Sequence, residues 1–98
     1  MFARTHTLET TAESHDRGLE LLQEVLPWLR NSNGFRGLLR LTNADRSRTL
    51  VITLWADEES MRQTWDASER FGEVIAETTG TRILGLEDYE VTFAEIAQ

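Results

Sequence analysis

The chain has 98 residues, of which 40% are hydrophobic and 28% are charged, and it contains no cysteine. This composition predicts one soluble globular domain over residues 1–98, and it excludes disulfides, thiolate nucleophiles and thiolate metal ligands. The formal net charge of −7 repels phosphate backbones and argues against nucleic acid as a partner. No apolar run suits a membrane span and no targeting pattern opens the chain, so we expect a cytoplasmic protein.

The first element that the sequence predicts is a strand over residues 2–8, FARTHTL, whose residues alternate in character. In a sheet with helices on one side, we expect the helix-packed face to take the small side chains Ala3, Thr5 and Thr7. The other face would carry Phe2, Arg4 and His6.

A helix should follow, because Thr10 and Glu13 have the spacing of a capping box. Its apolar stripe recurs every three or four residues, at Ala12, His15, Leu19, Leu22, Leu26 and Leu29. Pro27 lacks an N–H group, so we expect the helix to bend or end near it. The residues 31–34, NSNG, are typical of a turn.

Two strands over residues 35–42 and 48–55 are predicted to form a hairpin, because the connecting NADRS has turn-forming residues. The second strand carries apolar or uncharged side chains on both of its faces. Both faces should therefore be covered in the folded protein.

The second helical region should begin at Asp57, a plausible N-cap followed by two glutamates in the first turn. Residues 66–69, DASE, are expected to break it, with Ser68 capping a second piece that ends at Gly80. A looser segment, TRILGLED, would then lead to a last strand over residues 89–96.

The predicted order is β-α-β-β-α-β, which is the ferredoxin-like arrangement of the α+β class. Both helical regions would cover one face of a four-stranded antiparallel sheet, with the first strand central. The other face is too apolar to remain in water, and a second copy of the chain is its simplest cover. The sequence thus predicts a homodimer in which two sheets enclose a chamber, a dimeric α+β barrel.

Several segments carry a resemblance to a known family: GFRGLLRL, TLVITLWADEESMRQTWDAS and the closing YEVTF. Together they are similar to the antibiotic biosynthesis monooxygenase-like domains, over nearly the whole chain from Phe2 to about Phe93. The resemblance implies a dimeric α+β barrel. It also implies an enzyme like those members that oxidise aromatic or quinol compounds with O₂ and no cofactor, although others degrade haem and many have no known activity.

The haem-degrading members carry an Asn on the first strand and a Trp and a His in the second helical region. Trp65 matches the Trp of that pattern. The His position falls on Ile75, which cannot ligate iron, and the Asn position falls near His6 or Thr7. Because two of these three positions differ from the pattern of the haem-degrading members, haem degradation by that mechanism is not expected. No His-x-x-x-His or Glu-x-x-His spacing occurs either, so we predict no metal site and no cofactor.

Arg4 and His6 are the candidate catalytic residues, because an imidazole titrates near neutral pH and a guanidinium stabilises negative charge. His6 would be the base, and Arg4 would stabilise the anion that forms. The alternative is a structural role, in which Arg4 pairs with a glutamate such as Glu90 or stays in solvent near a strand end.

The candidate substrate-binding residues are aromatic: Phe2, Trp55, Trp65 and Phe71. They could hold a flat ligand, or they could be core and dimer contacts. The leading hypothesis is a cofactor-independent monooxygenase that acts on an aromatic or quinol-type molecule. The rivals are a non-catalytic dimer that binds a small apolar ligand, and a structural dimer whose barrel is filled by its own side chains.

Overall fold

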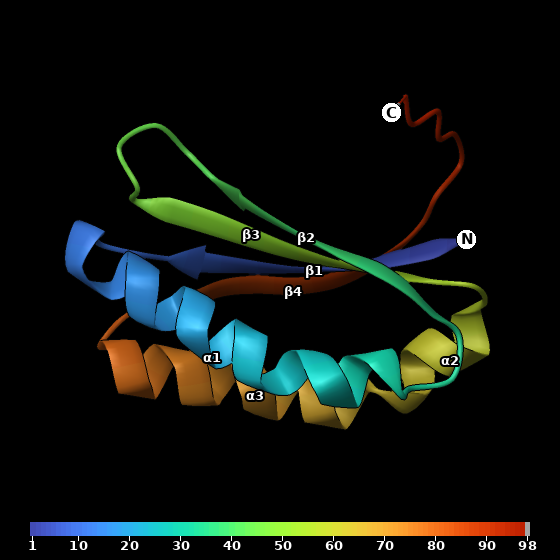
Figure 1. The fold of residues 1–98 in the computed structure, drawn as a ribbon, viewed down its shortest axis with the longest axis horizontal. Coiled ribbons are helices and arrows are strands. Elements are labelled where there is room, and N and C mark those ends of the chain that lie inside the picture. Colours follow the sequence, from blue (N-terminus) through green and yellow to red (C-terminus); the bar gives the residue numbers. More distant parts are fainter. Residues whose placement is uncertain (98) are drawn as a thin grey trace.

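The computed structural model describes residues 1–97 of the chain. It contains four strands and three helices in the order β1 (Phe2–Glu9), α1 (Ala12–Arg30), β2 (Phe35–Thr42), β3 (Arg48–Trp55), α2 (Glu58–Gln63), α3 (Trp65–Thr79) and β4 (Ile83–Glu90). The strands pair in the order β2-β3-β1-β4, and every pairing is antiparallel. All helices lie on one face of the sheet (Figure 1). The predicted α+β, ferredoxin-like β-α-β-β-α-β fold with a central first strand is confirmed.

The first helix begins one residue later than predicted, at a cap formed by Thr11 and Ser14. Thr10 instead ties the end of β1 to the 43–47 turn, because its hydroxyl donates to the Arg46 carbonyl and its N–H donates to the Ser47 carbonyl. Pro27 does not end the helix at once: α1 continues through it to Arg30. Pro27 thus removes one hydrogen bond within α1 without ending the helix.

The second helical region breaks at Thr64, between α2 and α3, so the break predicted at 66–69 with a cap at Ser68 is wrong. The N-cap at Asp57 is confirmed, because its side chain accepts a hydrogen bond from the Ser60 N–H. Gly80 ends α3 in the left-handed conformation, with φ of 68°, as its lack of a side chain permits.

The last strand was predicted too far along the chain. The strand is Ile83–Glu90, and residues 91–97 have no regular structure beyond the Val91 N–H bond to the Met1 carbonyl. β4 pairs along nearly the whole of β1, which supplies backbone partners to the less strand-like ILGLEDYE. Tertiary pairing thus outweighs the stronger alternation of the residues after Glu90.

The assignment of faces on β1 was also wrong. Arg4 and His6 point toward the helices, because Arg4 bonds the Met61 carbonyl in α2 and His6 bonds the Ser68 carbonyl in α3. The small side chains lie on the open face instead. A polar residue can occupy the helix-packed face here because the helices supply hydrogen-bond acceptors.

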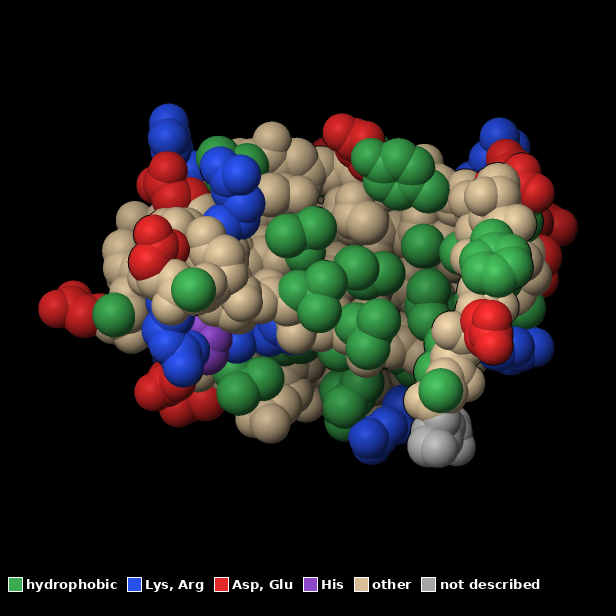
Figure 2. Space-filling view, turned by 90° about the horizontal axis from the view of Figure 1, so that it is seen from above, with side chains coloured by type: hydrophobic (Ala, Val, Ile, Leu, Met, Phe, Trp, Pro, Cys, Tyr) green, Lys and Arg blue, Asp and Glu red, His purple; other side chains and the backbone are tan. Residues whose placement is uncertain are grey.

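The open face of the sheet is largely apolar, and hydrophobic side chains gather at its centre (Figure 2). Leu39, Leu41 and Tyr89 are about half exposed there, at 50%, 49% and 50%. The core lies on the opposite side, between sheet and helices, where residues such as Leu8, Leu22 and Val51 form one buried cluster.

Candidate functional site

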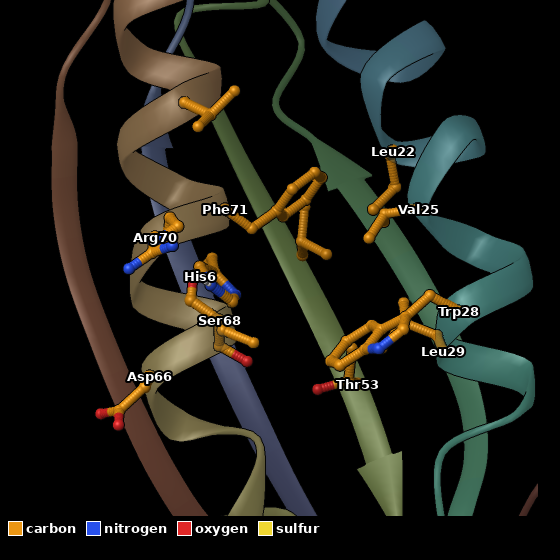
Figure 3. A pocket seen from close by; sticks show the side chains of 13 residues that line it. His6, Leu22, Val25, Trp28, Leu29, Thr53, Asp66, Ser68, Arg70 and Phe71 are labelled. Atoms are coloured by element: carbon orange, nitrogen blue, oxygen red, sulfur yellow. Dashed lines mark hydrogen bonds between the residues drawn. The ribbon is translucent and has the colours of Figure 1, made fainter.

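A cavity of about 540 Å³ lies between the sheet and the helices, with walls from β1, β3, α1 and α3 (Figure 3). Most of its lining is apolar: Leu22, Val25, Leu29, Val51, Phe71 and Val74. Asp66, Arg70 and the 46%-exposed Trp28 lie at the solvent side of the lining. Three more polar side chains, His6, Thr53 and Ser68, line the cavity from the sheet and from α3. The cavity can therefore hold a small apolar molecule against a few polar groups.

His6 is the buried titratable group of this cavity, with a residue exposure of 6%. Its Nε2 lies 3.0 Å from the Ser68 carbonyl oxygen, which can only accept, so Nε2 must carry the proton. Nδ1 is buried and has no hydrogen-bond partner within residues 1–97. Burial lowers the pKa of His6 below its ordinary value of 6.5, and the Ser68 bond opposes this shift. The imidazole is thus neutral at pH 7, with a free lone pair on Nδ1.

Arg4, two residues earlier on the same face, has no exposed surface. It forms a bidentate pair with Asp88 of β4, at 2.7 Å from Nε to Oδ1 and 3.0 Å from Nη2 to Oδ2. Nη1 donates to Thr64 Oγ1 at 2.8 Å and to Ser68 Oγ at 2.9 Å, and Nη2 also donates to the Met61 carbonyl at 2.7 Å. These bonds use all five N–H donors of the guanidinium.

Ser68 links Arg4 and His6, because it bonds to both of these buried polar residues of β1. Its hydroxyl accepts from Arg4, and its carbonyl accepts from His6. Arg4 therefore holds the start of α3 in place, and α3 in turn fixes the tautomer and the orientation of the His6 ring.

Of the predicted site residues, His6 and Phe71 line the cavity, whereas Arg4, Phe2, Trp55 and Trp65 do not. The Trp55 side chain is fully buried, and its ring packs edge-on against Phe35. The Trp65 ring lies on the Arg4 guanidinium, with Cζ 5.0 Å from the ring centroid. Phe2 packs against the cluster of Trp55 and Met61 and borders a separate pocket.

Sequence patterns did not indicate Trp28, Thr53 or Ser68 as cavity-lining residues, or Asp88 as the partner of Arg4. Trp28 had a readable signal, since it comes after Leu22 and Val25 at helical spacing along α1. Asp88 had none, because the pairing of β4 with β1 places it opposite Arg4.

Arg4 forms an ion pair, as in the structural role given above as the alternative, but with a different partner. Arg4 pairs with Asp88. Glu90, the partner that the sequence suggests, lies opposite Phe2 in the register of β1 and β4. The second histidine, His15, is remote from the cavity lining and contacts Thr42, Arg40 and Arg46.

Neither a metal-binding cluster nor a membrane-crossing helix occurs within residues 1–97. No group of three or more His, Cys, Asp or Glu residues there could hold a metal ion. Likewise, no helix in that part of the chain combines the length and the apolar character needed to cross a membrane.

The sequence of the chain matches one family of known proteins. The sequence profile of the family described as antibiotic biosynthesis monooxygenase matches residues 1–77. No curated protein matches the chain significantly.

Solved structures that match include a monooxygenase from the gene ActVA-Orf6 of Streptomyces coelicolor in complex with Nanaomycin D, with 16% identity, a TM-score of 0.76 and coverage of 99% of this chain and 92% of that one. SnoaB, a cofactor-independent oxygenase of Streptomyces nogalater, has 11% identity, a TM-score of 0.72 and coverage of 95% and 94%. The haem degrader MhuD of Mycobacterium tuberculosis, with two haems in its active site, has 22% identity, a TM-score of 0.67 and coverage of 97% and 99%. At these identities the likeness establishes a common fold.

Proposed function

The chain belongs to the antibiotic biosynthesis monooxygenase family, and we propose that it is a small oxygenase that acts on an aromatic or quinol-type molecule with O₂, without metal or flavin. The observation that carries the proposal is His6: a buried, neutral imidazole with an unpartnered Nδ1, in the lining of an apolar cavity. The fold shared with SnoaB, itself described as cofactor-independent, supports the same function.

The proposed reaction begins with proton transfer from the substrate to His6 Nδ1. Because the cavity is apolar, the resulting phenolate or carbanion is poorly solvated and is a strong electron donor to O₂. For an activated CH₂ group the overall change is CH₂ + O₂ → C=O + H₂O, which balances without an external reductant.

Arg4 has a positioning role in this proposal. Its five donors are already occupied by Asp88, Thr64, Ser68 and Met61, so none is free for a substrate oxygen. Its contribution is to hold Ser68, and through Ser68 the ring of His6. Substrate contacts would come from Phe71 and from Trp28 rather than from Phe2, Trp55 or Trp65.

The test is oxygen uptake with a panel of hydroquinones and naphthols. His6→Gln removes the base, and general-base catalysis contributes about 10²–10⁴-fold, so turnover should fall at least about 100-fold. His15→Gln is the matched control, because it changes the other histidine and leaves the cavity lining intact. Equal turnover by wild type and His6→Gln would overturn the assigned role.

A second candidate is a binding protein that sequesters a small aromatic ligand without chemistry. The observation that favours it is that His6 is the single buried titratable side chain in the lining of this cavity within residues 1–97. Saturable binding of a ligand without any oxygen uptake would select this candidate.

A homodimer formed through the open sheet face is the proposed assembly, because Leu39, Leu41 and Tyr89 are too exposed for a stable monomer surface. Leu41→Lys should lower the dimer fraction measured by sedimentation. Leu19→Lys, on the exposed side of α1, should leave it unchanged. A wild-type chain that sediments as a monomer would contradict the assembly.

A further inference from the structure

Three basic side chains meet at one end of the molecule, where the start of α1 lies near the turn between β2 and β3 (Figure 1). His15 comes from α1, Arg40 from β2 and Arg46 from the turn. Arg40 Nη1 lies 3.1 Å from His15 Nε2, and Arg46 Nη1 lies 2.8 Å from the same nitrogen. None of the three residues lines the large cavity, so the cluster is separate from the proposed oxygenase site.

The imidazole of His15 cannot accept hydrogen bonds from both guanidinium groups. Its Nδ1 lies 3.3 Å from Asp16 Oδ1, a carboxylate oxygen that accepts, so Nδ1 carries the proton and Nε2 has the one lone pair available in the ring. Thr42 Oγ1 lies 3.2 Å from Nε2 as a third neighbour. At least one guanidinium N–H in the cluster therefore lacks an acceptor. Protonation of His15 would remove the last lone pair and enlarge this surplus of donors.

The two guanidinium groups also lack a carboxylate partner. Within residues 1–97, no ion pair includes Arg40 or Arg46. Burial lowers the pKa of Arg40 below its ordinary value, the charge of Asp16 opposes this shift, and the charge of Arg46 adds to it. Two like charges held against one imidazole repel each other, and a bound anion would offset that repulsion. An acidic chain, with a net charge of −7, thus keeps an unneutralised positive cluster.

The fold directs both arginines to this cluster. Arg40 extends over Gly18 of α1, where an added Cβ would lie 3.3 Å from Nη2, so the glycine leaves room for the guanidinium. Arg46 has a φ of 60°, a conformation that residues with a side chain adopt infrequently. Two bonds hold it there: its N–H donates to the Asn43 carbonyl at 3.0 Å, and its carbonyl accepts from the Thr10 hydroxyl at 2.7 Å.

We propose that Arg40, Arg46 and the hydroxyl of Thr42 form a binding site for a small phosphate-type oxyanion, either free phosphate or the phosphate group of a monoester. Guanidinium groups donate to phosphate oxygens with strong, charge-assisted bonds. The donors come from both β2 and the turn, which suits a tetrahedral anion with oxygens in several directions better than a planar carboxylate. His15 is not a ligand of the anion, because its free nitrogen is an acceptor. The site is independent of the proposed oxygenase function.

NMR titration of the wild-type protein tests the site with three probes: inorganic phosphate, phenyl phosphate and benzoate. Sodium chloride keeps the ionic strength constant, because screening alone changes the attraction between charges. Both phosphates should bind saturably and shift the backbone amides of residues 40–46, and benzoate should bind more weakly. Tighter binding of phenyl phosphate than of phosphate would favour a monoester as the ligand, and the reverse order would favour free phosphate.

Variants then assign the donors. Arg46→Gln and Arg40→Gln should each weaken phosphate binding by about 10-fold, as the loss of a charge-assisted hydrogen bond predicts. Arg46 is exposed, so its variant should stay folded even if the variant at the partly buried Arg40 does not. Arg36→Gln is the matched control: it makes the same change at an exposed arginine of β2 outside the cluster, and it should alter the affinity by less than about 2-fold.

Three outcomes would overturn the inference. One is the absence of saturable phosphate binding up to about 50 mM, a concentration at which even a millimolar site is filled. The second is an equal loss of affinity in Arg36→Gln and Arg46→Gln, which would reflect general attraction of anions to positive charge. The third is tighter binding of benzoate than of phenyl phosphate. None of these measurements involves oxygen uptake, so each outcome leaves the proposed function to its own test.

Discussion

Two buried polar side chains, Arg4 and His6, lie two residues apart on the same face of β1, and they differ in how completely they are satisfied. All five N–H donors of Arg4 have acceptors, and its counterion Asp88 is close. His6 has one satisfied nitrogen and one that lacks any partner in the described part of the chain. The cavity lies beside the second residue and not beside the first.

This difference in hydrogen bonding indicates different roles for Arg4 and His6. A fully bonded buried charge rigidifies the structure and has no capacity left for a ligand. A buried acceptor without a partner costs free energy, and one role that such a group can have is catalytic. Arg4 therefore belongs to the framework, and we propose that His6 belongs to the site.

The largest expected effect is on the free energy of unfolding, and it comes from removing the counterion of Arg4. Asp88→Ala leaves the buried Arg4 charge without its counterion, which should lower the free energy of unfolding by about 3 kcal/mol. Glu90→Ala, at an exposed position on the same strand, should change it by less than about 0.5 kcal/mol. Urea denaturation measures both. A loss as small for Asp88→Ala as for Glu90→Ala would show that the ion pair is dispensable.

A smaller effect of opposite sign is expected at the site. His6→Leu replaces an incompletely bonded imidazole by an apolar side chain, so the protein should keep its stability or gain about 1 kcal/mol. The gain is limited because the Ser68 carbonyl loses its bond from Nε2. A loss of more than about 2 kcal/mol in urea denaturation would show that His6 is a structural residue.

The pH dependence of stability should give the smallest effect. The folded pKa of His6 is lowered by burial, so the unfolded chain binds more protons as the pH falls. Stability from this group is complete above about pH 6.5 and is lost as the pH falls from there to the folded pKa. Wild-type stability should therefore decrease more than that of His6→Leu between about pH 8 and about pH 5. Parallel curves for the two proteins would contradict the lowered pKa.

Local patterns were sufficient for much of the fold. The hairpin strands over residues 35–42 and 48–55 and the cap at Asp57 are where the sequence predicts them, because turn residues and alternation act over a few positions. The last strand was misplaced because its position depends on pairing with β1, which lies about eighty residues earlier in the chain.

The site was less predictable, and Arg4 shows why. From sequence alone, a charged residue is expected away from the helix-packed face. That expectation fails where the helices supply hydrogen-bond acceptors for the charge. The acceptors for Arg4 come from α2, α3, β4 and the break between the two helices. Such an arrangement has no local signature. His6 and Phe71, by contrast, are predicted from the chemistry of their side chains, and both line the cavity.

The break at Thr64 has a consequence for how the chain tolerates changes in its length. Each residue added to a helix turns the rest of that helix by about 100°. One extra residue between Thr64 and Ser68 would therefore swing the serine carbonyl off the imidazole and its hydroxyl off the guanidinium. The exposed 43–47 turn lies outside any helix, so an added residue there does not rotate a following helix. Insertions and deletions should therefore be tolerated better in this turn than in the first turn of α3.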